Sequence, residues 1–310
     1  MTIILAFPSI LAFGMAPLQA VAEPADALPA PVVSFTPARP LQGTAVVVSV
    51  TLEAGQGQPA GIRAMLAGEP LHFEPDSIGT WHALGAVPID ASGTVHFPVM
   101  VELASGGVDT LQAALEIATG QYAMERLTVA PRFGAAPDSA LAARMARESA
   151  RAREVSERSH ATPRLWDSAF VRPRDARITS GFGHGREFNG RIQSRHMGVD
   201  FAGAVGTPIR APNRGVVALV DEFYLGGNVV YIDHGAGLVT AYLHLSRQEV
   251  AQGDTVERGQ IIGRVGATGR VTGPHLHWIA RYGRVTIDPL SLTELPALRA
   301  REIVEESMSK

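Results

Sequence analysis

Residues 228–243 read Asn228-Val-Val-Tyr-Ile-Asp-His-Gly-Ala-Gly-Leu-Val-Thr-Ala-Tyr-Leu243. Two runs rich in β-branched and aromatic residues flank a turn that holds two glycines, a pattern typical of neighbouring strands in an antiparallel sheet. Similar short runs stand at 215–220, 261–265 and 275–280, with glycine turns near them. The stretch 170–291 is therefore predicted to form one β-rich domain.

Residues 30–131 carry the same kind of punctuation, with turn signals such as Pro75-Asp76 and Gly106-Gly107 between short strand-like runs. The clearest runs are Thr44–Leu52, Val95–Val101 and Arg126–Ala130. Several short strands at such spacing predict a small β-sandwich. The histidines of this region, His72, His82 and His96, are scattered and suggest no site.

Residues 137–160 differ from both β-rich stretches, because charged residues alternate with alanines from Asp138 to Arg158. Asp138 or Ser139 can cap a helix start, and Glu154 precedes Arg158 by four residues. We expect a helix that links the two domains and exposes its charges to solvent. The fold class predicted for the chain is thus mainly β, with one linking helix.

The composition limits the chemistry of any site. The 310 residues carry a formal net charge of -3 and contain no cysteine. The length favours about two domains, and the charge does not point to nucleic acid. Without cysteine, disulfides, thiol catalysis and Cys-type zinc sites are excluded, so a metal would need histidines and carboxylates.

The two ends of the chain resemble processing or tail segments. Ile3 to Met15 is apolar and uncharged, and Ala20-Val-Ala22 has the form of a cleavage site. Residues 1–22 are therefore predicted to be a signal peptide, although no Lys or Arg precedes the apolar run. We expect cleavage and export to the periplasm, cell surface or medium; the alternative is an uncleaved anchor. Residues 292–310 are expected to form a short helix and a loose charged tail.

Two short motifs bring metal-binding residue types together. In His196-Met-Gly-Val-Asp200, strand alternation places His196 and Asp200 on one face, with Gly198 leaving space between them. In His275-Leu-His277 the two histidines also share a face. Either motif alone is a weak signal, but His and Asp are both valid zinc donors.

A third segment, Tyr242-Leu-His-Leu245, adds one more histidine to the same domain. Alternation would turn Leu243 and Leu245 inward, and Tyr242 and His244 the opposite way. Read alone, His244 is equally well a structural histidine at a strand end. Read together, the three segments put five candidate ligands or bases in one domain. Three protein ligands with one open position is the arrangement of a catalytic zinc.

These segments resemble the signature of the M23 metallopeptidases, the lysostaphin-type or LytM family. The likeness extends from about Ile178 to Pro289 and includes Gly206-Thr-Pro208 and Gly269-Arg-Val-Thr-Gly-Pro-His-Leu-His277. It implies an antiparallel sheet with a substrate groove. It also implies one Zn²⁺ held by His196, Asp200 and His277, with catalytic roles for His244 and His275. The stretch 186–195 lacks the tyrosine that some family enzymes use.

The resemblance implies hydrolysis of peptide bonds in peptidoglycan, either cross-links or bridges. One of His244 and His275 would accept the proton of a water and the other would stabilise the charged intermediate; which does which stays open. The alternative is a non-catalytic LytM-type module that binds or activates wall hydrolases, which predicts missing ligands. A biotinyl or lipoyl carrier is excluded, because residues 170–291 contain no lysine. The N-terminal sandwich would dock an envelope partner, act as a spacer, or cover the groove.

Overall fold

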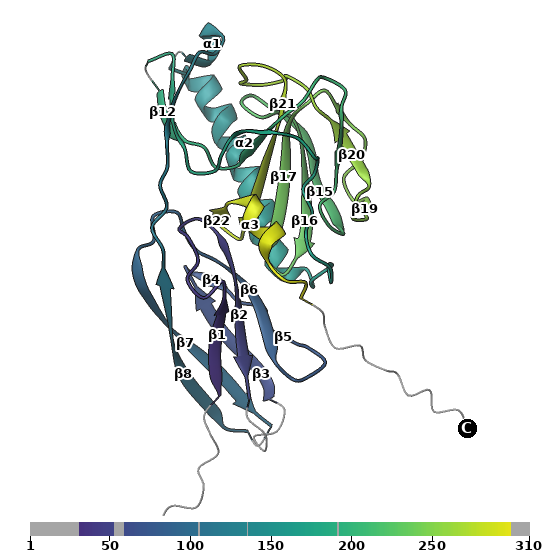
Figure 1. Ribbon diagram of the computed structural model, residues 1–310. Coiled ribbons are helices and arrows are strands. Elements are labelled where there is room, and N and C mark those ends of the chain that lie inside the picture. The colour runs from purple at the N-terminus through teal and green to yellow at the C-terminus, as the bar shows by residue number, and fades with distance from the viewer. Residues whose placement is uncertain (1–30, 53–58, 105, 135, 191, 299–310) are drawn as a thin grey trace, which may run out of the picture.

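The structure, a computed structural model, describes residues 31–52, 59–104, 106–134, 136–190 and 192–298. The predicted signal peptide, residues 1–22, lies outside the described residues, as do residues 299–310 of the predicted tail. The chain is mainly β, as the sequence predicts. Figure 1 shows strands of the N-terminal region at one end and those of the C-terminal region at the other.

Two four-stranded antiparallel sheets form the N-terminal region. The first has the order β1 (Val32–Thr36), β2 (Ala45–Thr51), β6 (Trp81–Ala86) and β5 (Glu74–Pro75). The second has the order β4 (Glu69–Pro70), β3 (Pro59–Leu66), β7 (Gly93–Leu103) and β8 (Val108–Ile117). Alternate residues of facing strands, such as Val46 and Val48 on β2 and Val99 and Val101 on β7, are fully buried in one core.

An eight-stranded antiparallel sheet forms the centre of the C-terminal region. Its order is β10 (Ile178–Ser180), β13 (Val199–Ala202), β21 (His275–Tyr282), β17 (Leu238–Leu245), β16 (Gly227–Gly235), β15 (Gly215–Phe223) and β19 (Thr255–Val256), with β22 (Val285–Ile287) beside β21. One face packs on a core that contains Tyr242, Leu276 and Trp278, each fully buried. A three-stranded sheet of β14 (Pro208–Arg210), β20 (Ile261–Arg264) and β18 (Arg247–Gln248) completes this region.

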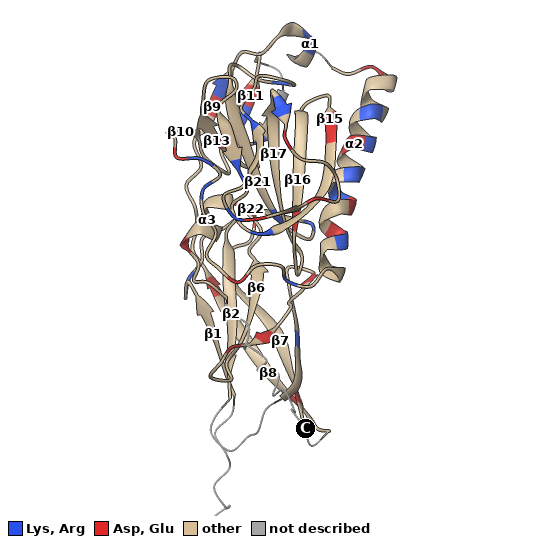
Figure 2. Cartoon of the chain, turned by 90° about the vertical axis from the view of Figure 1, so that its right-hand side faces the viewer, with Lys and Arg blue, Asp and Glu red and all other residues tan. Residues whose placement is uncertain are grey.

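The helix α2 (Ser139–Arg158) covers the opposite face of the large sheet. Asp138 caps it by accepting the N–H of Leu141 at 2.8 Å. Ala152 and Val155 pack on the sheet, and Figure 2 shows how many charged positions the helix carries along its length. The helix is followed by η1 (Ser159–Ala161) and preceded by the short α1 (Pro131–Gly134).

The connection between the two regions adds a strand to the site. Strand β9 (Met124–Leu127) pairs in parallel with β11 (Gly185–Phe188), which pairs with β12 (Ile192–Arg195). The final helix, α3 (Pro289–Glu294), begins three residues earlier than the sequence analysis expected, which placed its start at residue 292. It begins there because Asp288 caps it and accepts the N–H of Leu290 at 2.9 Å. None of the described helices is long and apolar enough to cross a membrane.

Candidate metal centre

Two neighbouring strands and the loop before one of them bring the predicted ligands together. Asp200 on β13 is the register partner of His277 on β21, so the antiparallel ladder itself sets these two side chains side by side. His196 lies four residues before Asp200, between β12 and β13. All three residues are buried, with 2%, 6% and 9% of the surface of His196, Asp200 and His277 exposed.

Three donor atoms form a small triangle. His196 Nε2 lies 3.1 Å from Asp200 Oδ1 and 3.0 Å from His277 Nδ1, and His277 Nδ1 lies 2.7 Å from Asp200 Oδ1. These residues are a group of His and Asp whose donor atoms could hold one metal ion. Zinc with ligand bonds of about 2.0–2.2 Å needs donors about 3.3–3.6 Å apart in a tetrahedral site. The triangle is only slightly tighter, so two imidazoles and one carboxylate fit Zn²⁺.

Hydrogen bonds around the triangle select which atoms can bind the ion. The Nδ1–H of His196 donates to the carbonyl of Gly181 at 2.7 Å, which leaves the lone pair of Nε2 facing Asp200 and His277. Arg186 donates to Asp200 Oδ2 at 2.6 Å, so Oδ1 is the oxygen left toward the histidines. Such outer hydrogen bonds orient ligands in metal sites.

The protonation states suit metal binding. Burial alone would raise the pKa of Asp200, but the charges and hydrogen bonds of His277 and His196 lower it well below its usual range. Burial lowers the pKa of His277 to about 4, against the opposing effect of Asp200. A carboxylate beside neutral imidazoles is the form in which these groups bind a metal.

His244 and His275 lie next to the triangle. Their ring centroids are 4.9 Å apart, and that of His244 is 5.9 Å from His277. His275 Nε2 is 3.7 Å from Asp200 Oδ1. The Nδ1–H of His244 donates to the carbonyl of Thr268 at 2.8 Å, and that of His275 to the carbonyl of Gly273 at 2.8 Å. Each ring thus keeps Nε2 free as a proton acceptor, and burial lowers the pKa of His244 well below its usual value.

The predicted facing of Tyr242-Leu-His-Leu245 is wrong. Tyr242 and Leu245 are both fully buried in the core, while Leu243 lies on the opposite face, where it pairs with His277. The register between β16 and β17 skips between Tyr242 and Leu245, and His244 has a φ of 65°. This bulge breaks the alternation of the strand and turns the His244 ring toward the ligands.

The space predicted beside Gly198 is occupied. A Cβ at this glycine would lie 2.5 Å from the carbonyl oxygen of Trp278 and 2.6 Å from Cε1 of His277. The glycine is therefore needed because β21 approaches this closely. This close approach places the His277 ring against the segment 196–200. Gly198 does not act as a spacer between His196 and Asp200.

Sequence reasoning missed three polar residues beside the ligands: Glu125, Ser180 and Arg186. The Glu125 carboxylate, from β9, accepts hydrogen bonds from Ser180 Oγ at 3.0 Å and from Arg186 Nε at 3.1 Å. Ser180 Oγ in turn lies 3.0 Å from His196 Nδ1. Glu125 also pairs with His184 at 2.9 Å. No local pattern could reveal this network, because Glu125 lies more than fifty residues from its partners.

A cleft of about 330 Å³ opens beside the donor triangle. Asp200, His244 and His275 line it on the metal side, and the loop from Arg270 to Pro274 lines another side. Arg270 and Thr272 of this loop both line the cleft. Its third side includes Glu125, Leu127 and Val129 from the connection between the two regions. A smaller hollow of about 200 Å³ is lined by His196, His244 and His277.

Comparison with known proteins agrees with this geometry. The sequence model of Peptidase family M23 matches residues 194–289, the part that holds the ligand triangle, His244 and His275. The peptidoglycan DD-endopeptidase ShyC of Vibrio cholerae is 45% identical over 119 residues, 37% of this chain and 27% of that protein. The DD-carboxypeptidase/endopeptidase Mpg of Neisseria meningitidis is 42% identical over 116 residues, again 37% of this chain and 27% of that protein. The matches thus span about a quarter of these curated relatives.

One solved structure matches both regions of the chain. A crystal structure from Pseudomonas aeruginosa, described as peptidase M23, has a TM-score of 0.62 and 28% identity. The match covers 82% of this chain and 95% of that one. The overall fold of the matched part is thus similar in the two proteins. The C-terminal region of this chain is a peptidase family M23 domain.

Proposed function

We propose that this chain is an exported, zinc-dependent endopeptidase that hydrolyses peptide bonds of bacterial peptidoglycan, in cross-links or in bridges between stem peptides. The observation that carries the proposal is the convergence of His196, Asp200 and His277 on one point beside an open cleft. The peptidoglycan endopeptidases among the relatives support the substrate class. A wall substrate in turn supports a place in the periplasm or at the cell surface.

Bound Zn²⁺ would lower the pKa of a water to about 7 and polarise the scissile carbonyl. His244 and His275 are suited to move the protons, because each presents a bare Nε2 toward the ligands. One would accept a proton at Nε2 from the attacking water and pass that proton to the leaving amine, and the other would stabilise the oxyanion when it carries a proton on Nε2 as well as on Nδ1. Main-chain carbonyls hold both rings, so the residues need little reorganisation.

The test is digestion of purified peptidoglycan fragments, with products identified by mass. We expect the full chain to cleave a peptide bond, to lose this activity with a strong chelator, and to regain it with one equivalent of Zn²⁺. Elemental analysis should find one zinc per chain. A chain that binds zinc but cleaves no peptidoglycan fragment would contradict the proposal and favour a non-catalytic wall-binding module.

The N-terminal sandwich is proposed to limit which substrates reach the cleft. The support is that β9, which leads from the sandwich, carries Glu125 to one side of the cleft. A partner in the envelope could bind the sandwich and would then act on the site through this strand. The comparison to make is cleavage of whole peptidoglycan sacculi against cleavage of short peptide fragments. A sandwich that limits access predicts that fragments are cut much faster per bond.

A further inference from the structure

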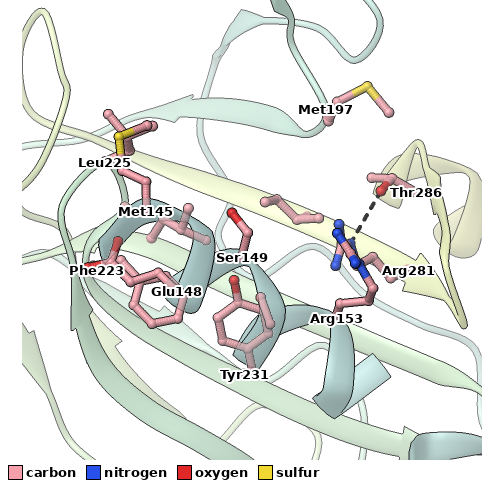
Figure 3. A pocket seen from close by; sticks show the side chains of 14 residues that line it. Met145, Glu148, Ser149, Arg153, Met197, Phe223, Leu225, Tyr231, Arg281 and Thr286 are labelled. Atoms are coloured by element: carbon pink, nitrogen blue, oxygen red, sulfur yellow. Dashed lines mark hydrogen bonds between the residues drawn. The ribbon is translucent and has the colours of Figure 1, made fainter. Parts of the chain in front are cut away.

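A second cavity, of about 390 Å³, lies between α2 and the outer face of the large sheet. Its floor is apolar and consists of Phe223, Tyr231, Leu243 and Ile279. Figure 3 shows Phe223 and Tyr231 of the sheet together with Met145 and Ser149 of the helix around this cavity. Helix and sheet therefore do not close on one another here, although they pack together at Val155.

Positive groups gather at one end of this cavity. Figure 3 shows the guanidinium groups of Arg153 and Arg281 close together, with Arg281 hydrogen-bonded to Thr286 at 3.3 Å. Neither arginine forms an ion pair within the described part of the chain. Burial lowers the pKa of Arg281, and the charge of Arg153 adds to that effect. Two neighbouring cations without a partner favour a bound anion.

A hydroxyl group completes the polar end. Tyr231 is 6% exposed, and its hydroxyl has no hydrogen-bond partner among the described residues, although it lines the cavity. Because the hydroxyl oxygen itself is not fully buried, it is accessible from the cavity, where it can donate to a ligand atom. The cavity thus offers a hydroxyl donor next to two guanidinium groups, above an apolar floor.

The acidic groups around the cavity do not neutralise these cations. Glu148 lines the cavity, but its carboxylate accepts from Arg144 Nε at 2.6 Å and from the N–H of Tyr224 at 2.9 Å. Glu157 acts on Arg281 electrostatically but forms no ion pair with it. The end formed by Arg153 and Arg281 therefore stays open to an anion.

The geometry of β21 connects this cavity to the metal centre. Every second side chain of β21 points to the face that α2 covers, namely those of His277, Ile279 and Arg281. The side chains between them, of Leu276, Trp278 and Ala280, are fully buried on the other face. Arg281 lies four positions after His277, which is about 13 Å along the strand at 3.3 Å per residue. An extended peptide of about four residues covers the same distance.

The cavity under α2 and the hollow at the metal centre adjoin one another, because they share lining residues. Met197, Leu225, Gly226 and Leu243 line both this cavity and the small hollow that holds His196, His244 and His277. Met197 follows one ligand directly, and Leu243 precedes His244. A chain that leaves the metal centre along β21 therefore meets apolar side chains first and the two arginines last.

We propose that the cavity under α2 is a subsite for the free C-terminal carboxylate of the peptide substrate, with Arg153, Arg281 and Tyr231 as its ligands. The inference rests on the proposed peptidase function and adds a specificity to it. Peptide segments with small or apolar side chains suit the floor, and a terminal carboxylate suits the cationic end. The enzyme would thus distinguish a stem peptide with a free terminus from one whose terminus is blocked.

The probe is a synthetic cross-linked stem-peptide dimer with free terminal carboxylates, compared with the same dimer as its C-terminal amides. Binding to the full chain is measured by calorimetry after the metal is removed with a chelator, so that no cleavage occurs. We expect the acid to bind about tenfold more tightly than the amide, as a charge-assisted hydrogen bond allows. With zinc restored, the same preference should be seen in KM and not in kcat.

Arg153→Gln and Tyr231→Phe test the residues, because both keep the bulk of the side chain, and Arg153 is exposed on α2. Each should weaken binding of the acid and leave binding of the amide unchanged. Arg158→Gln is the matched control on the same helix, since Arg158 is 65% exposed and pairs with Glu154. Arg281→Gln is less suitable as a first variant, because Arg281 is largely buried and its loss could unfold the chain.

Equal affinity of the wild-type chain for acid and amide would overturn the subsite. So would an acid preference that survives in Arg153→Gln and Tyr231→Phe. If the dimers are cleaved with zinc but acid and amide bind alike, the subsite fails and the peptidase function stands. If the metal-free chain prefers the acid through Arg153 but cleaves no peptide with zinc, the peptidase function fails and a carboxylate site stands.

Discussion

Three of the four histidines at the centre donate their Nδ1 hydrogens to main-chain carbonyls: His196 to Gly181, His244 to Thr268 and His275 to Gly273. The fourth, His277, instead presents Nδ1 to Asp200 at 2.7 Å. Hydrogen bonds to the backbone thus decide which nitrogen of each ring faces the reaction site. The two histidines of β21 differ in position: His277 Nδ1 belongs to the donor triangle, and His275 Nε2 lies 3.7 Å from Asp200 Oδ1, at its edge.

Alanine substitutions should separate ligands from proton carriers. We expect His196→Ala and Asp200→Ala to lose zinc and activity together, because two donors cannot hold the ion tightly in a three-ligand site. His275→Ala should keep the zinc and lose activity by about 10²–10⁴-fold, the usual contribution of a general acid or base. Metal content and peptide cleavage are measured on the same samples. Near wild-type turnover in His275→Ala would remove His275 from the catalytic set.

Arg186 is expected to act through Asp200. Since Arg186 holds Oδ2 and leaves Oδ1 for the metal, Arg186→Gln should weaken zinc affinity about 10–100-fold, as loss of an outer hydrogen bond does. Competition with a chromogenic chelator measures the affinity without reference to activity. Arg126→Gln is the control, because Arg126 is 84% exposed and meets only Glu187, at 3.9 Å. Unchanged zinc affinity in Arg186→Gln would show that the ion pair does not orient the ligand.

At the scale of single elements, the alternation of strand residues allowed much of the centre to be predicted. It placed His275 and His277 on one face correctly, since β21 is regular there, whereas His196 lies near Asp200 from a segment between β12 and β13 that is not a strand. It failed at His244, because the bulge in β17 reverses the facing of its neighbours. It could not find Glu125, whose place depends on a parallel pairing between β9 and β11, distant in sequence. Local rules thus work within regular strands and fail where a bulge or a long-range pairing sets the geometry.

His234 on β16 should make the stability of the domain sensitive to acid. The side chain is fully buried and bonds to the carbonyl of Arg214 at 2.7 Å and to Thr240 Oγ1 at 2.8 Å. Burial lowers its pKa to about 4, below the ordinary 6.5. The unfolded chain therefore takes up a proton first as the pH falls. Stability is complete above pH 6.5 and decreases as the pH falls to about 4, by on the order of 3 kcal/mol.

Urea unfolding at several pH values between 7 and 4.5 measures this effect. His234→Gln should show a shallower loss of stability with acid than the wild type, whatever its stability at pH 7. His96→Gln, at an exposed position on β7, serves as the control and should follow the wild type. An identical pH dependence of the wild type and His234→Gln would contradict the assignment to His234.

At the scale of the whole molecule, the sandwich and the peptidase domain share buried contacts. The core of the sandwich continues into the C-terminal region through Trp166, Tyr282 and Leu292. Glu69 on β4 is 5% exposed and bonds to His160 at 3.0 Å and to the N–H of Arg284 at 3.2 Å. Tyr282 donates to the carbonyl of Pro70 at 2.6 Å. We therefore expect the two regions to unfold together.

Glu69→Ala should weaken this interface. The change removes the buried acceptor of His160 and of the N–H of Arg284, and loss of a buried hydrogen-bond partner costs about 1–3 kcal/mol. The free energy of unfolding in urea, followed by tryptophan fluorescence, measures the loss. Glu116→Ala is the control, because Glu116 is 61% exposed and pairs with Arg39 on the surface, where less than about 1 kcal/mol is expected. Equal effects of the two substitutions would show that the interface is not held by Glu69.

Strand β9 has a practical consequence for any shortened form of this protein. A fragment that starts at residue 170 would retain every proposed ligand and proton carrier, yet it would lack Glu125, Leu127 and Val129. Arg186 and His184 would then lose the Glu125 carboxylate, with which both form ion pairs. One side of the cleft beside the donor triangle would also be missing. A minimal fragment that keeps the native surroundings of the ligands must therefore begin upstream of Met124.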